Sequence, residues 1–208
     1  MFIGKNIKGI EQMPDNNLSH DIILASASPR RVDLLAQIGV TPKDVFPADI
    51  DETPNKKELP HQLAMRLSQE KALAIHAQRP KDYILAADTV VACGKNILDK
   101  ALTADQAAAF LARLQGRRHH VYGGITIVTP QGDLLTKNCK TMVQFRPLNK
   151  QQIIDYIDLG EWHGKAGGYA IQGYAGCFVK RLSGSYSNVV GLSLYDTMTL
   201  LQRVGNAK

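Results

Sequence analysis

Two adjacent arginines stand where residues 24–35, LASASPRRVDLL, are expected to begin a helix. Ser28 is a good N-cap, and the proline after it suits the first helical position. Arg30 and Arg31 then oppose the positive end of the helix dipole, at a cost of roughly 0.3–1 kcal/mol each. With the Ser26 hydroxyl and free backbone N–H groups, the two guanidinium groups would make a strong anion site. Two solvated arginines on an exposed turn are the alternative that remains open at this point.

An aspartate lies inside the most β-like run of the chain, residues 83–93 (YILAADTVVAC). Apolar residues on both alternating faces predict a strand that is covered on both sides. A buried, unpaired carboxylate is costly, so Asp88 either has a partner or faces a pocket. Asp88, next to Thr89, is therefore the best general-base candidate in the sequence. A structural aspartate bonded to the backbone is the alternative.

Two lysines are candidates for binding an anion near this aspartate. Lys71 interrupts the apolar row of a helix expected over residues 60–78. A lysine that extends its ammonium to solvent explains the interruption, as does one that reaches inward to a phosphate. A hairpin turn at 94–96 returns the chain to Lys100, which we expect near Asp88.

Two further segments combine charge with irregular backbone. Residues 49–54 hold three carboxylates, including Glu52, and favour either a surface turn or an edge that binds metal or water. Residues 164–173, GKAGGYAIQG, are rich in glycine, which lets the backbone approach a ligand closely, and Lys165 adds positive charge. The spacing matches neither a Walker loop nor a dinucleotide fingerprint. The alternation of Tyr169 and Ile171 predicts a strand rather than a flexible linker.

The elements that must position these residues alternate between helices and strands. Capping boxes predict helices that begin after Thr103 and Asn149. Residues 119–129 and 134–146 read as strands joined by a turn. His119 lacks the partners of a zinc site, so we expect it and its neighbour His120 at a sheet edge. The order predicts an α/β fold with a mixed sheet.

Length and composition suit one domain, or one domain with two lobes, because 208 residues can bury a sizeable core. Hydrophobic content of 44% and charged content of 21% are ordinary for globular proteins. A formal net charge of +6 favours an anionic partner. The basic residues are spread along the chain, which argues against a nucleic-acid-binding tail.

The remaining composition bears on the cell compartment. Three cysteines, at 93, 139 and 177, lack metal-ligand spacing and are expected as reduced thiols in the cytoplasm. No apolar run approaches the ~20 residues that span a bilayer, so no membrane partner is expected. Residues 1–20 have no signal-peptide apolar core and are expected as a flexible extension, with a single domain over 21–208.

Seven stretches, taken together and in order, resemble the Maf family of nucleoside triphosphate pyrophosphatases. They are LASASPRR at 24–31, RLSQEKA at 66–72, AADTVV at 86–91, ILDK at 97–100, LQGRRHHVY at 114–122, GKAGGYAIQG at 164–173 and GSYSNVVGL at 184–192. The match covers nearly everything after residue 21, which makes it far more specific than any single motif.

The resemblance implies an ITPase-like (Maf-like) α/β fold, in which a long, twisted mixed sheet carries two lobes around a cleft. It also implies a homodimer that hydrolyses nucleoside triphosphates between the α- and β-phosphates with a divalent cation. Carboxylate ligands and a phosphate substrate favour Mg²⁺ or Mn²⁺. No stable nucleic-acid partner is expected.

On matching positions, the resemblance assigns a role to each candidate residue. Asp88 is the expected proton acceptor, and Glu52 and Asp88 are the expected metal ligands. The expected substrate-binding residues are Ser26, Arg30, Arg31, Lys71, Thr89, Lys100, Lys165 and Gln172.

Three positions separate two subfamilies. The dTTP/UTP type carries Arg, Thr and Gln where this chain has Arg30, Thr89 and Gln172, whereas the 7-methyl-GTP type typically carries an aromatic residue, Gln and Glu. All three positions match the dTTP/UTP type. A 7-methyl-GTP pyrophosphatase is one alternative, and a non-enzymatic septum-formation regulator or nucleic-acid binder is another.

The chain departs from the family pattern at three positions. The family usually has Pro, Thr and Pro where this chain has Ala101, Gly123 and Ser193. None is a proposed catalytic group, so we expect activity to be retained and local loop geometry to differ.

Overall fold

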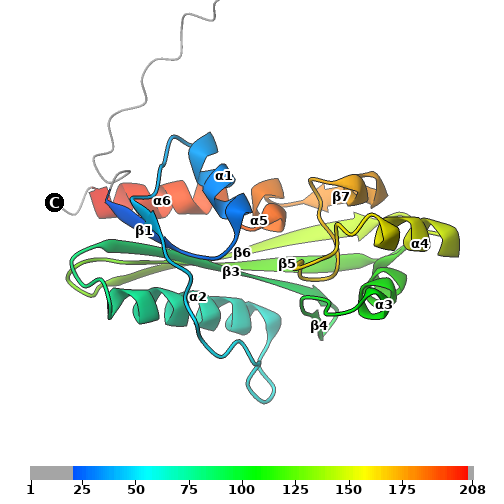
Figure 1. Cartoon of the computed structure of the whole chain (residues 1–208), viewed down its shortest axis with the longest axis horizontal. Helices are drawn as coiled ribbons and strands as arrows, with labels where there is room; N and C mark the ends of the chain where they lie inside the picture. The colour runs from blue at the N-terminus through cyan, green and yellow to red at the C-terminus, as the bar shows by residue number, and fades with distance from the viewer. Residues whose placement is uncertain (1–20, 206–208) are drawn as a thin grey trace, which may run out of the picture.

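A computed structural model describes residues 21–205, which form a seven-stranded sheet with helices on both faces (Figure 1). The strands are β1 (Ile22–Ala25), β2 (Asp44–Val45), β3 (Tyr83–Cys93), β4 (Asn96–Leu98), β5 (Arg118–Val128), β6 (Leu134–Phe145) and β7 (Val179–Ser183). The helices are α1 (Pro29–Gln37), α2 (Pro60–His76), α3 (Ala104–Leu114), α4 (Lys150–Asp158), α5 (Tyr186–Val190) and α6 (Leu194–Gly205), with the 3₁₀ helix η2 (Tyr174–Phe178). The extension predicted over residues 1–20 lies outside the described residues.

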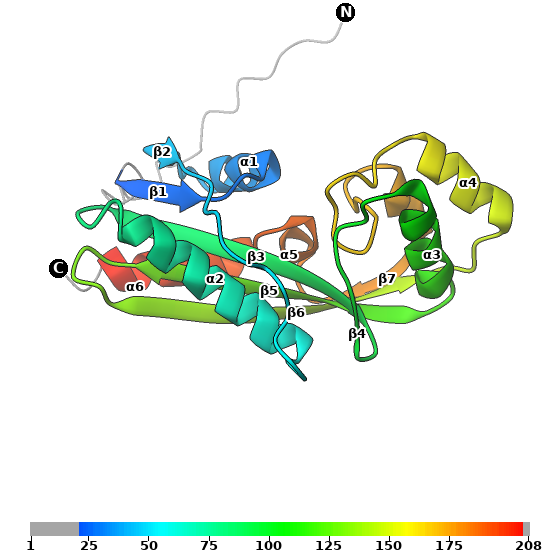
Figure 2. The ribbon, with the colours of Figure 1, turned by 60° about the horizontal axis from the view of Figure 1, so that its bottom comes forward.

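The sheet is mixed, as the sequence predicts. Its order in the described residues is β2-β1-β3-β5-β6-β7, with β4 beside β3. β1 runs parallel to β2 and β3, and every other pairing is antiparallel. The long strands β3, β5 and β6 continue beneath two groups of helices, so one sheet carries two lobes (Figure 2).

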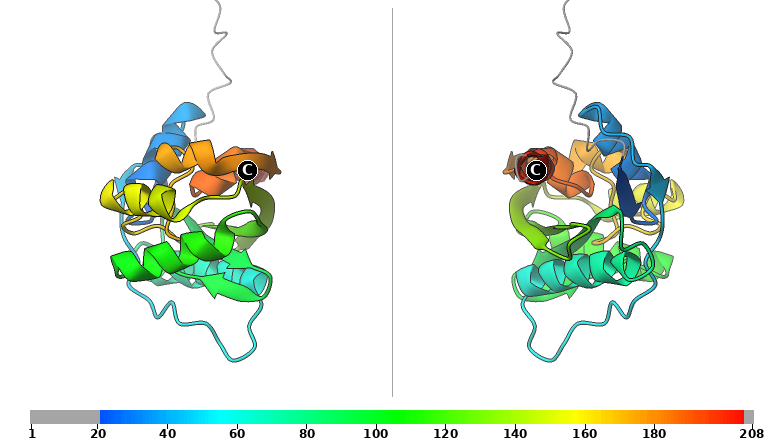
Figure 3. Two further views of the ribbon diagram at one scale, coloured as in Figure 1. Left: turned by 90° about the vertical axis from the view of Figure 1, so that its right-hand side faces the viewer. Right: turned by 90° about the vertical axis from the view of Figure 1, so that its left-hand side faces the viewer.

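The first lobe explains why β3 is apolar on both faces. Leu85 and Ala87 pack with α1 and α6, whereas Ile84 and Ala86 pack with α2. These helices lie on opposite sides of the sheet (Figure 3). The prediction of a strand covered on both sides is therefore confirmed.

Close packing of α2 on β5 depends on one glycine. A Cβ at Gly124 would overlap the Ala64 carbonyl oxygen of α2. Beside it, the Ser68 and Thr126 hydroxyls form a buried hydrogen bond of 2.9 Å. The helix is thereby held against the sheet at the level of Lys71, one turn further on.

The second lobe packs α3, α4 and η2 over the far ends of β5 and β6. Its core includes Val121, Phe145, Tyr156 and Phe178, all fully buried. Asn149 exchanges hydrogen bonds with Gln152, so the capping box expected there is confirmed. Thr103 accepts from Gln106 N and caps its helix, but the Gln106 side chain accepts from Leu102 N, so this box is incomplete. The strand β7 and the short helix α5 were not predicted.

The expectation that His119 and His120 lie at a sheet edge is wrong. Both belong to β5, which pairs with β3 on one side and β6 on the other. The His119 side chain is fully buried, with its Nε2 2.8 Å from the Tyr169 hydroxyl and its ring edge-on to Phe145. Because β7 extends the sheet beyond β6, the two histidines are interior to it.

Two of the three departures from the family pattern have a local explanation. The Asn188 side chain fills the space above Gly123, where a Cβ would overlap its Oδ1. Ser193 precedes α6; its hydroxyl donates to Asp196 Oδ2 at 2.6 Å and accepts from Asp196 N at 3.4 Å, so it caps the helix. Ala101 is buried after β4, and nothing in the structure explains why it is not proline.

The structure also bears on two expectations from composition. Cysteines 93, 139 and 177 are all free thiols, as predicted. Across residues 21–205, no helix has both the length and the apolar character that crossing a membrane requires.

Burial of His119 predicts that the stability of the fold falls in acid. Burial lowers its pKa from 6.5 to about 4, so below about pH 6.5 the unfolded chain takes up a proton there that the folded chain does not. This stability is fully present above pH 6.5 and is lost toward pH 4, at up to about 1.4 kcal/mol per pH unit. In urea unfolding, His119→Gln should lose less stability than the parent protein between pH 7 and pH 5. Equal losses would contradict a neutral, buried imidazole.

Candidate functional site

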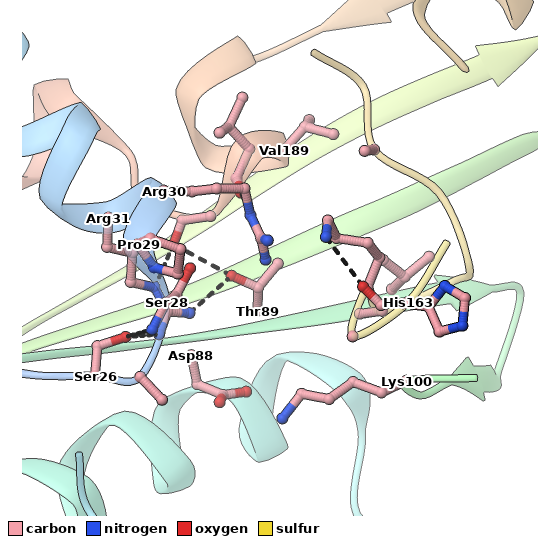
Figure 4. Close-up of a pocket in the computed structure, with 18 of the residues that line it drawn as sticks. Ser26, Ser28, Pro29, Arg30, Arg31, Asp88, Thr89, Lys100, His163 and Val189 are labelled. Carbon is pink, nitrogen blue, oxygen red and sulfur yellow. Dashed lines mark hydrogen bonds between the residues drawn. The ribbon is translucent and has the colours of Figure 1, made fainter. Parts of the chain in front are cut away.

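The cleft lies where the edge of β3 is left open. In the described residues β1 pairs with β3 as far as Ala86, and β4 pairs with it from Val91 onward. The segment between them, with Asp88 and Thr89, has no strand on this side. Successive residues of a strand point to opposite faces, so Asp88 faces α2 whereas Thr89 faces α1. Both are reached from one cleft of about 390 Å³ between the lobes (Figure 4).

The expected anion site begins where β1 ends. The Ser26 hydroxyl oxygen accepts hydrogen bonds from Ser28 N at 3.1 Å and from an Arg31 Nη at 2.9 Å. Ser28 stands at the N-cap of α1, but its side chain makes no capping hydrogen bond within the described residues. Pro29 has no N–H group and Arg31 N donates to Ser28 O at 3.1 Å, so Arg30 N is the backbone donor that the first turn of α1 offers beside the cleft.

The two arginines differ in their surroundings. The Arg31 guanidinium is partly buried and is held by three hydrogen bonds: it donates to Gly191 O at 2.9 Å, to the Ser26 hydroxyl at 2.9 Å and to the Thr89 hydroxyl at 3.3 Å. The Arg30 guanidinium is half-buried, with one long contact of 3.4 Å to Val190 O, and it extends into the cleft (Figure 4). Burial lowers the pKa of both groups, and Asp88 opposes the shift at Arg31. Arg31 thus fixes the wall of the cleft, and Arg30 is the more available cation.

A chain of alternating charges lines the opposite wall. The Lys71 ammonium lies 2.6 Å from Asp88 Oδ1 and 2.6 Å from Glu52 Oε1. The Lys100 ammonium lies 3.1 Å from the other Glu52 oxygen. Burial would raise the pKa of Glu52, but its hydrogen bonds and attraction to Lys71 and Lys100 outweigh this and lower it. Lys71 therefore reaches inward from the interrupted apolar row of α2.

The glycine-rich segment 164–173 forms the wall of the second lobe, and the strand predicted around Tyr169 and Ile171 is wrong. Positive φ angles at Gly164, Gly167 and Gly168 turn the backbone out of extended geometry. In the described residues, the backbone pairing of this segment with other strands is limited to an isolated bridge between Lys100 and Ala166. Tyr169 and Ile171 both pack into the core instead of alternating.

Two predicted residues of this segment reach the cleft. Gln172 lines it, and Lys165 donates to the His163 carbonyl at 3.0 Å. Burial and the nearby Arg30 lower the pKa of Lys165. Both residues therefore extend the cleft from the first lobe to the second.

All the residues predicted for the site line this one cleft. They are Ser26, Arg30, Arg31, Glu52, Lys71, Asp88, Thr89, Lys100, Lys165 and Gln172. Their positive charges exceed their negative charges by three, which suits an anion with several charges. The roles assigned to them stay predictions.

Sequence reasoning missed other residues of the cleft. Val190 and Gly191, at the end of α5, supply the carbonyl oxygens that hold the two arginines. His163 and Tyr169 also line it. The stretch 184–192 was part of the family match but contained no charged residue to suggest a role.

The described residues contain no cluster of three or more histidine, cysteine or acidic side chains that could hold a metal. Glu52 and Asp88 are two carboxylates that both contact Lys71. Mg²⁺ is commonly bound by one or two carboxylates together with substrate phosphates and water. A cation that binds together with a phosphate-bearing ligand needs no third carboxylate, and the metal site expected at Glu52 and Asp88 stays a prediction.

Comparison with known proteins agrees with the resemblance noted in the sequence. A family model described as Maf-like protein matches residues 21–204. A relative in Rhizobium etli, named dTTP/UTP pyrophosphatase, is 52% identical over 194 residues, which cover 90% of this chain and 94% of the relative. Relatives of the same name in Mesorhizobium japonicum and Caulobacter vibrioides are 51% and 50% identical; the matches cover 88% of this chain and 91% and 95% of theirs.

The solved structures give a weaker likeness. A nucleoside-triphosphatase, also titled dITP/XTP pyrophosphatase, from Mycobacterium abscessus is 17% identical and overlaps 60% of this chain and 72% of its own, with a TM-score of 0.40.

The buried pair of Lys71 and Asp88 predicts a large stability effect. Lys71→Met should lower the free energy of unfolding at pH 7.5 by about 3 kcal/mol, because the buried Asp88 carboxylate loses its partner. Adding Asp88→Asn should recover much of the loss in urea unfolding. As a control, Lys43→Met breaks an equally short but exposed ion pair with Asp82 and should change stability little. Comparable losses for the two lysines would contradict the burial of the Lys71 pair.

Proposed function

Because this chain belongs to the Maf family, we propose that it is a nucleoside triphosphate pyrophosphatase acting on dTTP and UTP. The products would be a nucleoside monophosphate and pyrophosphate. One observation carries the proposal: a carboxylate, Asp88, lies at the open edge of β3 inside a cleft with excess positive charge. The names of relatives about 50% identical over most of both chains support the choice of substrate.

The cleft can bind a triphosphate through groups from both lobes. The N-terminus of α1 and Arg30 offer donors on one side, and Lys100 and Lys165 offer ammonium groups on the other. These cations also lie where negative charge would grow as pyrophosphate leaves, which is the charge that must be stabilised. Arg31 holds Ser26, Thr89 and the end of α5 in place for this binding.

Asp88 is suited to take a proton from water. A water oxygen would form a bond to phosphorus at the α–β linkage, the bridging P–O bond would break, and the proton would pass to Asp88. Lys71 lies 2.6 Å from one carboxylate oxygen of Asp88 and fixes the position of this side chain in the cleft. Mg²⁺ or Mn²⁺, held by Glu52 and Asp88 with phosphate oxygens, would supply further positive charge when bound.

The choice between substrates rests on Arg30, Thr89 and Gln172. The Thr89 hydroxyl donates to Gly191 O and accepts from Arg31, both at 3.3 Å, so Thr89 acts on the substrate through the position of these neighbours. Arg30 and Gln172 lie on opposite lobes and face the same cleft. We propose that these two side chains distinguish a pyrimidine triphosphate from a methylated purine one.

The proposal also covers the cell compartment and the oligomeric state of the enzyme. Three free thiols favour a reducing compartment, and we propose the cytoplasm. We also propose a homodimer, which the family resemblance implies; the mass measured by light scattering would test it.

A substrate panel tests the proposed function directly. Pyrophosphate release should be faster with UTP or dTTP than with 7-methyl-GTP when Mg²⁺ or Mn²⁺ is saturating. Faster turnover of 7-methyl-GTP would overturn the substrate assignment. Strong binding to DNA, with no hydrolysis of any triphosphate, would overturn the enzyme assignment.

Replacement of the proposed base separates chemistry from binding. Asp88→Asn should lower kcat by at least about 100-fold, because the amide cannot accept the proton. UTP should still bind, since Arg30, Lys100 and Lys165 are unchanged; equilibrium binding and pyrophosphate release measure the two effects. Retained turnover in this variant would falsify the role of Asp88.

A further inference from the structure

We propose that His119, buried beneath the cleft, is a positioning residue: through the Tyr169 hydroxyl it holds the segment that carries Lys165 and Gln172. The inference rests on the proposed function, because it concerns how the same cleft binds its triphosphate. Neither the charge pattern nor the cleft lining assigns His119 a role, since it does not reach the cleft.

The contact joins the sheet to the glycine-rich segment. His119 lies on β5 and is fully buried, and its Nε2 lies 2.8 Å from the Tyr169 hydroxyl. Tyr169 is itself buried, yet one side of it lines the cleft. In the sequence it stands between Lys165 and Gln172, so a shift of Tyr169 moves both.

Aromatic packing gives the contact one geometry. The His119 and Tyr169 rings pack edge-on, with their centroids 5.5 Å apart. Each ring also packs edge-on against Phe145, at centroid distances of 5.0 Å for His119 and 4.9 Å for Tyr169. Three mutually packed rings leave little freedom for the tyrosine to turn. The hydrogen bond between the Tyr169 hydroxyl and the His119 imidazole then sets the distance between the glycine-rich segment and β5.

The segment has other anchors, but those that tie it to neighbouring elements are made by its backbone N–H groups. Gly167 N donates to Leu98 O at 2.9 Å, and Ala170 N donates to the Tyr156 hydroxyl at 3.1 Å. With positive φ at Gly167 and Gly168, the backbone between these anchors is intrinsically permissive. The bond to His119 supplies the restraint that the glycines do not.

The hydrogen-bonded pair of His119 and Tyr169 is less favourable for stability than an apolar pair would be at this place in the core. Within the described residues His119 Nδ1 is buried without a hydrogen-bond partner, whichever nitrogen carries the proton. A buried polar atom without a partner destabilises a fold, and an apolar pair of similar shape would avoid the penalty. A gain in substrate positioning explains why the pair is present.

The test compares variants by pyrophosphate release from UTP and by urea unfolding. His119→Leu and Tyr169→Phe should each raise KM about tenfold while kcat changes less than about twofold. The double variant should be no worse than either single one, because both remove the same bond. His119→Gln should recover part of the loss, since an amide can still bond to the hydroxyl.

Stability provides the discriminating measurement. The double variant should be at least as stable as the parent protein, because the polar pair and the unpartnered nitrogen leave together. The control Phe178→Leu, in the core of the same lobe and away from the cleft, should lose stability without changing KM. If the two polar variants lose stability and leave KM unchanged, His119 is structural and the inference is overturned.

The outcome also separates this inference from the proposed function. A parent protein that releases no pyrophosphate from UTP would refute the function. A parent protein that is active, with additive effects of the two single variants on KM, would refute the shared bond alone.

Discussion

The contact on which the site depends is the Lys71 ammonium between Asp88 and Glu52, at 2.6 Å from each. A carboxylate on a buried strand is costly alone, and an ammonium on a buried helix face is equally so. Each charge is tolerated because the other is present. The two side chains can meet only if α2 keeps a fixed distance from β3. The close approach at Gly124 and the Ser68–Thr126 bond hold the helix at that distance. Packing in the first lobe is therefore also what keeps the proposed base beside its ammonium partner.

The open edge of β3 completes the arrangement. β1 ends at Ala25 because the chain turns there into α1, and β4 joins β3 only from Val91. The interval gives solvent access to residues on both faces of one strand. Asp88 thus meets Lys71 on one face while Thr89 meets Arg31 on the other. The proposed base and a proposed binding residue therefore have different surroundings, although they are adjacent in the sequence.

Much of this was predictable, and the failures have identifiable causes. The strand at 83–93, the two helix caps and the charged residues that line the cleft were predicted because periodicity, caps and isolated charges are local signals. The strand expected at 169–171 failed because alternation of large residues cannot reveal positive φ at the glycines before them. His119 was misplaced because its neighbours in the sheet come from distant parts of the sequence. The carbonyls of Val190 and Gly191 were missed because the backbone has no sequence signature.

Three long strands shared by both lobes also limit how the molecule can move. Closing the lobes like a hinge would bend β3, β5 and β6 together and strain the paired backbone along each of them. The strands that the lobes share therefore resist such a motion and set the spacing of the lobes in this structure. Adjustment to a substrate falls to long side chains such as Arg30 and Lys100, which reorient far faster than domains rotate. A cleft of this kind favours ligands that fit its existing shape, so little of the backbone has to rearrange when a ligand binds.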